Sequence, residues 1–169
     1  LEEADRAYQK VIELDPSYSN AYNLLGYVYA SLHDYEKAFS AIKTYMALIP
    51  DAWNGYDSGC EVYMLAGQFD DALKMAEEGL KRNASWHGLY NRQGQTYLLM
   101  GDPEKAREKF RTYAALNARG VESAQRAASM TLSFEGRIRE AVDLLRQAVT
   151  RLKAKSDQSN ELSAPFFIA

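Results

Sequence analysis

The sequence has few of the residues that build covalent cross-links or metal sites: one cysteine and two histidines among 169 residues. A single cysteine excludes an internal disulfide and any zinc site made from several cysteines. No run of 18 apolar residues occurs, and the first residues lack the basic and apolar regions of a signal peptide. We therefore expect a soluble protein that does not enter the membrane, with a lean toward the cytoplasm.

Catalytic patterns are also missing. The sequence contains neither a phosphate-binding loop nor a glycine-framed serine. His33 and His87 have no second histidine or cysteine at ligand spacing, and Cys60 is most simply a small buried hydrophobic residue. The adjacent Glu77 and Glu78 diverge around a helix axis and cannot act together as acid and base. These observations predict no enzymatic activity, no cofactor and no metal site.

Small residues recur with a fixed period. Alanine returns after 34, 34, 34 and 35 residues, at Ala4, Ala38, Ala72, Ala106 and Ala141. A second small residue keeps the same period, at Gly26, Cys60, Gly94 and Ser129. Tyrosines follow it too, at Tyr22, Tyr56 and Tyr90 and at Tyr29, Tyr63 and Tyr97. A period of this length predicts stacked helical hairpins that share apolar contacts with their neighbours.

The first complete unit reads Tyr22, Leu25, Gly26, Tyr29, Ala38, Ile42, Tyr45 and Pro50. This resembles the tetratricopeptide repeat (TPR), whose pattern is an aromatic residue, Leu-Gly, Tyr, Ala, a second aromatic residue and a closing Pro. The resemblance implies an all-α fold, an α-solenoid of antiparallel hairpins wound as a right-handed superhelix. Later units depart from the pattern, with Gly59 and Cys60, then Ala128 and Ser129, in place of Leu-Gly.

The resemblance extends over residues 1–155, which we expect to form one repeat domain. We divide it into a half repeat and four full repeats, at 1–18, 19–52, 53–86, 87–120 and 122–155. Residues 156–169 are a tail or the start of a further repeat. Because the chain starts in mid-hairpin and its last helix carries a broad apolar face, we expect a fragment of a longer protein.

Local signals agree with helical hairpins. Gly67, Gly101 and Gly136 can take the left-handed conformation that ends a helix, and His33 occupies the same place in the first unit. Asp102 followed by Pro103 is typical of a helix start. Trp53 and Trp86 flank the hairpin junctions, and the sequence leaves open whether they pack against helix starts or stand at the groove rim.

In this family the first helix of each hairpin lines the inside of the curve. If that holds here, the second, fifth, ninth and twelfth positions of each unit face the groove. These are Asn20, Asn23, Tyr27 and Ala30; Asn54, Asp57, Glu61 and Met64; Gly88, Asn91, Gln95 and Leu98; Ser123, Arg126, Met130 and Ser133. The amides could bond the backbone of an extended peptide, and Tyr27, Met64, Leu98 and Met130 could form apolar pockets. Alternatively, the asparagines are solvated residues near helix starts.

Co-chaperone members of the family capture a terminal carboxylate with two lysines, two asparagines and an arginine. Only Arg92 matches that set, because Asn23, Tyr27, Ser58 and Gly88 occupy the other positions. We therefore reject capture of a chaperone tail.

Charge is unevenly distributed, with net −7 over residues 1–84 and +4 over 85–169. The basic residues fall mostly on second helices without exposed aromatics between them, which argues against nucleic acid as a partner. We predict a protein–protein interaction scaffold that holds a peptide segment of a partner in its concave groove. The alternatives are a regulatory or substrate-docking arm of a larger multidomain enzyme, and self-association through open apolar ends or oppositely charged halves.

Overall fold

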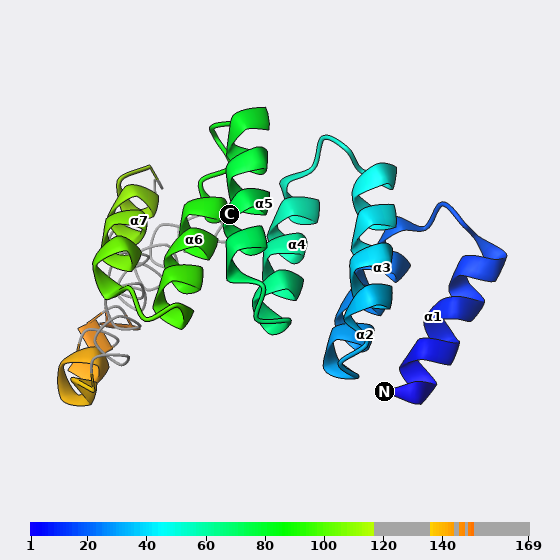
Figure 1. Ribbon diagram of the computed structural model, residues 1–169, viewed down its shortest axis with the longest axis horizontal. Coiled ribbons are helices and arrows are strands. Elements are labelled where there is room, and N and C mark those ends of the chain that lie inside the picture. Colours follow the sequence, from blue (N-terminus) through cyan, green and yellow to red (C-terminus); the bar gives the residue numbers. More distant parts are fainter. Residues whose placement is uncertain (117–135, 144–145, 148, 151–169) are drawn as a thin grey trace, which may run out of the picture.

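The computed structural model describes residues 1–116, 136–143, 146–147 and 149–150. Seven helices follow one another within residues 1–116 (Figure 1). They are α1 (Glu2–Leu14), α2 (Ser19–Ser31), α3 (Tyr35–Leu48), α4 (Trp53–Leu65), α5 (Phe69–Arg82), α6 (Gly88–Leu99) and α7 (Pro103–Leu116). The described part of the chain contains no strand, and most of the expected unit 122–155 lies outside it.

The helices form a row of hairpins. The pairs α2 and α3, α4 and α5, and α6 and α7 each pack closely, and α1 packs against α2. Figure 1 shows this row running from α1 at one end to α7 at the other. Each hairpin contacts the next one along the chain, as expected for a stack in single file. The all-α solenoid predicted from the sequence is confirmed.

First and second helices differ in how they meet their counterparts in the next hairpin. The first helices contact one another, α2 with α4 and α4 with α6. Among the described residues, the second helices do not, since α3 contacts neither α5 nor α7 and α5 does not contact α7. Successive hairpins are therefore closest on the side of their first helices, which places α2, α4 and α6 on the inner side of the stack.

Small residues at the repeat positions allow the helices of a hairpin to approach. A Cβ atom on Gly26 would lie 2.6 Å from Cδ1 of Ile42, and one on Gly94 would collide with the ring of Phe110. Ala38, Ala72 and Ala106 are likewise almost wholly buried. The alternation of small and large residues in the sequence is thus the packing pattern of the core.

The helix ends follow the predicted turn chemistry. His33, Gly67, Gly101 and Gly136 all have positive φ angles, from 60° to 78°. Asp102 caps α7, since its Oδ1 accepts a hydrogen bond of 3.0 Å from the backbone N–H of Lys105, and Pro103 is the first helical residue. Within the described residues, no helix has the length and apolar character needed to cross a membrane.

Candidate functional site

We define the inner face as the exposed side of α2, α4 and α6 that carries the predicted groove residues. Four asparagines lie on it: Asn20 and Asn54 are exposed, and Asn23 and Asn91 are half-buried. None of the four side chains makes a hydrogen bond to another described residue. The amide oxygen of Asn23 is shielded from solvent and has no partner. The amide groups of Asn20, Asn54 and Asn91 therefore remain available to a ligand.

Beside the asparagines, Arg92 on α6 is the centre of a polar network that joins three hairpins. Its Nε and Nη2 donate to the two carboxylate oxygens of Asp57 on α4, at 2.5 and 2.8 Å. Nη2 also donates to Glu61 at 3.2 Å, and Nη1 donates to Gln95 at 3.1 Å. The pairing with Asp57 is bidentate, the geometry in which a guanidinium and a carboxylate interact most strongly.

Glu61 extends this network to α2. Its carboxylate accepts a hydrogen bond of 2.8 Å from the hydroxyl of Tyr27. Tyr27 and Glu61 occupy the same position in successive repeats, 34 residues apart. Together with the bonds from Arg92 to Glu61 and Gln95, this links the ninth positions of three consecutive units across one surface. The network formed by Tyr27, Asp57, Glu61, Arg92 and Gln95 is called the inner network below.

The inner network also contains every charged residue of the three inner helices. Helix α2 has none, α4 has Asp57 and Glu61, and α6 has Arg92. Arg92 and Asp57 are largely withdrawn from water, with 19% and 18% of their side-chain surface exposed. Arg92 faces both carboxylates, so the inner network keeps a net charge of −1, and the rest of the inner face presents neutral hydrogen-bonding groups.

Burial and neighbouring charges shift the pKa values of this region. Desolvation raises the pKa of Tyr27 to about 12; a hydrogen bond with Ser58 opposes this shift, and Glu61 adds to it. The hydrogen bond to Asp57 raises the pKa of Arg92, so the guanidinium stays charged. Behind the network, burial raises the pKa of the Cys60 thiol to about 12, and its Sγ lies 3.4 Å from the carbonyl oxygen of Ala72. Cys60 is an unreactive core residue, as the sequence indicated.

Two predicted groove residues lie in the core instead. Ala30 and Leu98, both at the twelfth position, have 3% and 2% of their surface exposed. Ala30 packs with Ala38 and Ile42, and Leu98 packs with Phe110. The expectation was wrong for these two residues because the ends of α2 and α6 turn this position toward the second helix of the same hairpin. Met64, at the same position of α4, is half-buried.

The remaining predicted residues divide into two groups. Gly88 lies against Trp53, since an added Cβ would be 3.3 Å from the indole ring. Arg126 and Met130, with the two serines of the same unit, lie outside the described residues.

The two tryptophans differ in their surroundings. Trp86 packs against Tyr56 with ring centres 5.5 Å apart, whereas Trp53 at the start of α4 is 43% exposed.

Sequence analysis missed the structural role of Arg92. The available signal was a pair of opposite charges 35 residues apart on successive first helices, Asp57 and Arg92, which the repeat geometry brings side by side. The network also explains why Arg92 does not serve as a carboxylate anchor, since Asp57, Glu61 and Gln95 occupy its donor groups. Among the described residues no cluster of three potential metal ligands occurs.

Comparison with known proteins agrees with this geometry. Two family models described as tetratricopeptide repeat match residues 7–39 and 62–121, together more than half of the chain. The fold is similar to that of a thermophilic TPR protein from Thermus thermophilus, with a TM-score of 0.69, 19% identity, and coverage of 95% of this chain and 88% of the other.

Two further solved structures are similar. A TPR protein from Parabacteroides merdae has a TM-score of 0.71 at 14% identity, over 89% of this chain and 59% of the other. YrrB, described as a TPR protein with an unusual peptide-binding site, has a TM-score of 0.51 at 20% identity, over 88% and 78%. The chain belongs to the tetratricopeptide repeat family, whose stacked hairpins serve as a protein–protein interaction scaffold.

Proposed function

We propose that the inner face binds an extended segment of a partner protein, chiefly through hydrogen bonds to the peptide backbone. The observation that supports this most directly is the row of asparagines Asn20, Asn23, Asn54 and Asn91, whose amide groups are all left without a protein partner among the described residues. Asn20 and Asn54 share the second position of successive units, and Asn23 and Asn91 share the fifth position of the first and third units. Asn23 and Asn91 are half-buried, which distinguishes them from the exposed Asn20 and Asn54.

The chemistry of an amide suits this task. Each asparagine side chain can donate and accept, and an extended peptide offers an N–H and a C=O at every residue, spaced by about 3.3 Å. Such hydrogen bonds involve only the backbone of the peptide, so peptides with different side chains can bind in the same way.

The inner network supports the proposal in a second way. Because Tyr27, Glu61 and Arg92 connect α2, α4 and α6, the spacing of the three first helices is fixed before a ligand arrives. A preorganised surface loses less conformational entropy on binding. YrrB, a protein of similar fold, is described as having a peptide-binding site. The similarity between YrrB and this chain is one of fold alone. The fold is generally a non-catalytic scaffold.

The proposal can be tested by site-specific photocrosslinking. A benzoylphenylalanine at Asn54 places the crosslinker on the inner face, and one at Glu77 places it on an exposed site of α5 as a matched control. We expect a partner to crosslink from position 54 and not from position 77. The same partner captured from position 77 alone would rule out the inner face.

A second arm uses the combined substitutions Asn20→Ala, Asn54→Ala and Asn91→Ala. They remove amide groups without touching the inner network, so the fold should be retained, which circular dichroism can confirm. Asp57 is left intact because removing it would leave the charge of Arg92 poorly compensated. Unchanged affinity of the crosslinked partner for this folded variant would contradict the proposed contacts.

A further inference from the structure

A cavity lies on the opposite side of the stack, between the second helices α3 and α5. Its volume is about 550 Å³, within the range of small-ligand pockets, roughly 300–1,000 Å³. It exists because α3 and α5 do not contact each other, while α4 closes the space from behind. The lining residues are Phe39, Ser40, Ile42, Lys43, Met46, Gly59, Val62, Tyr63 and Met75.

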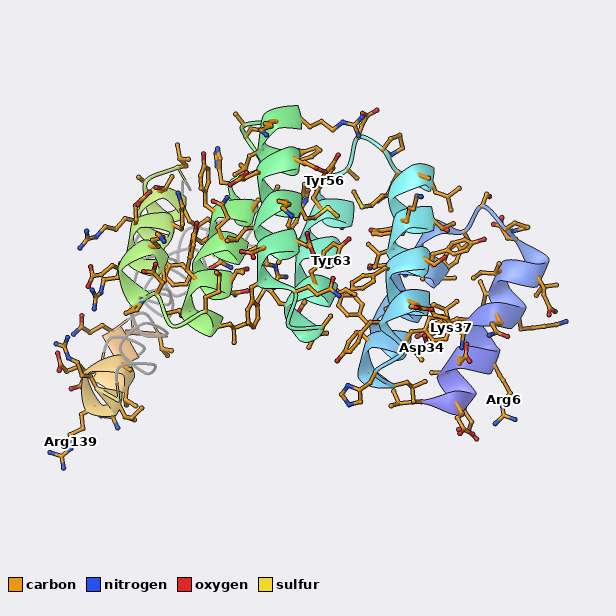
Figure 2. The ribbon with its side chains drawn as sticks, in the orientation of Figure 1. Arg6, Asp34, Lys37, Tyr56, Tyr63 and Arg139 are labelled. Carbon is orange, nitrogen blue, oxygen red and sulfur yellow. The ribbon has the colours of Figure 1, made fainter. Side chains whose placement is uncertain are left out.

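The walls of the cavity are apolar and adaptable. Met46 from α3 and Met75 from α5 contribute flexible thioether side chains, which adjust to ligands of different shape. Tyr63 projects from α4 (Figure 2) and stacks on Phe39, with ring centres 4.6 Å apart. Gly59 forms part of the floor, where the absence of a side chain leaves room beside Met75.

One charge stands in this apolar lining, that of Lys43. Lys43 is exposed and has no ion pair with any described residue, whereas the neighbouring Lys37 pairs with Asp34 and Lys74 pairs with Asp71. An unpaired cation beside an apolar cavity is complementary to a ligand that has an apolar body and an adjacent negative charge. The volume exceeds what a single small side chain would fill.

We propose that this cavity is a second docking site, distinct from the inner face, which takes large apolar side chains of a partner protein next to an Asp or Glu that pairs with Lys43. The occupant is a short acidic-flanked apolar segment, such as one face of an amphipathic helix. Apolar anchors that fill a desolvated pocket carry most of the affinity in protein interfaces, and a rim charge adds specificity. The site does not depend on the asparagines of the inner face.

The test begins with a random peptide library displayed on phage and selected on the immobilised full chain. We expect enrichment of peptides that carry Leu, Phe, Met or Trp within four residues of an Asp or Glu. Selected peptides are then synthesised, and their affinities are measured by fluorescence polarisation. Enrichment of peptides without an acidic residue, or with basic residues instead, would overturn the proposal.

Two variants locate the binding. Ser40→Trp places an indole from the exposed rim over the cavity and should weaken binding at least about tenfold. Lys43→Glu should weaken it by roughly threefold to tenfold, and Lys81→Glu, an exposed lysine of α5 outside the lining, should not. Equal binding of the selected peptides to Ser40→Trp, or equal effects of the two lysine reversals, would overturn the proposal.

Further measurements separate this site from the inner face and from small molecules. Peptides that lose binding in the triple asparagine variant but not in Ser40→Trp would support the inner face and overturn the cavity as their site. The probe 1-anilinonaphthalene-8-sulfonate has an apolar body and one negative charge. If it binds the chain and is excluded by Ser40→Trp while no peptide is enriched, the cavity serves a small amphiphile and the assignment to a partner protein is wrong.

Discussion

The ion pair between Arg92 and Asp57 should stabilise the stack far more than any surface pair of the described chain. Both side chains are mostly buried, the pairing is bidentate, and it joins two hairpins rather than two turns of one helix. Replacing Arg92 by Ala would leave Asp57 without its cation and Glu61 without one of its two donors. Replacing Asp57 by Ala would leave a largely buried guanidinium with weaker partners.

The magnitude follows from the burial. Removing one partner of a fully buried ion pair costs about 3–5 kcal/mol, and exposed pairs are worth about 0.2–1 kcal/mol. At 19% and 18% exposure the pair lies nearer the buried limit, so each single substitution should reduce the free energy of unfolding by about 2–3 kcal/mol. The double variant should lose less than the sum of the two, with a coupling energy of about 1–2 kcal/mol.

A double-mutant cycle checks these values by urea denaturation, followed by far-ultraviolet circular dichroism. The matched control is Lys74 and Asp71, an i,i+3 pair at 2.9 Å whose side chains are 68% and 47% exposed. Its coupling energy should stay below about 0.5 kcal/mol. Equal coupling in the two pairs would refute the reasoning, because burial and bidentate geometry would then make no difference.

Three other predictions follow from the packing. Gly94→Ala should destabilise the chain by about 1–3 kcal/mol because the new Cβ collides with the Phe110 ring. The measurement is a lower melting temperature. An unchanged melting temperature would show that the ring can move. The folded pKa of Cys60, about 12, lies above its ordinary value of 9.0, so the thiol contributes stability below pH 9 that is lost as the pH rises toward 12. At pH 8 a thiol reagent should therefore label Cys60 only as the chain unfolds. Rapid labelling of the native protein would contradict the burial of this thiol. Tyr27→Phe should cost about 1–3 kcal/mol in urea denaturation, and no loss would mean that its bond to Glu61 is not formed in solution.

Much of the fold could be predicted from the sequence because its determinants are local and periodic. The 34-residue spacing of small residues fixed the hairpin register, since Gly26 and Gly94 must lie where another side chain needs the space. The turn at His33 was predictable because glycine occupies the corresponding place in the other units. Such signals recur from unit to unit, so a position that departs from the pattern in one unit can be assigned from the corresponding positions of the others.

The inner face was harder to predict because it depends on angles that the period does not encode. The twelfth position was expected to face the groove, yet Ala30 and Leu98 are buried against their second helices. Rotating a first helix by a few tens of degrees about its axis is enough to move this position from the groove into the core. The partners of Arg92 were missed for a related reason: Asp57 comes within 2.5 Å only once α4 and α6 are packed together.

The two proposed surfaces differ in their electrostatics, and salt should distinguish them. On the inner face the charged residues of α2, α4 and α6 all belong to the inner network and sum to −1, so a peptide held by asparagines meets little uncompensated charge. Its affinity should change little between about 0.05 and 0.5 M salt, a roughly tenfold range of ionic strength. In the outer cavity, Lys43 is unpaired and exposed, so its attraction for an acidic residue is screened as the Debye length falls from about 14 to about 4 Å over that range. A partner segment whose affinity falls with salt in the native chain, but not in Lys43→Glu, is therefore held at the cavity and not by the asparagines.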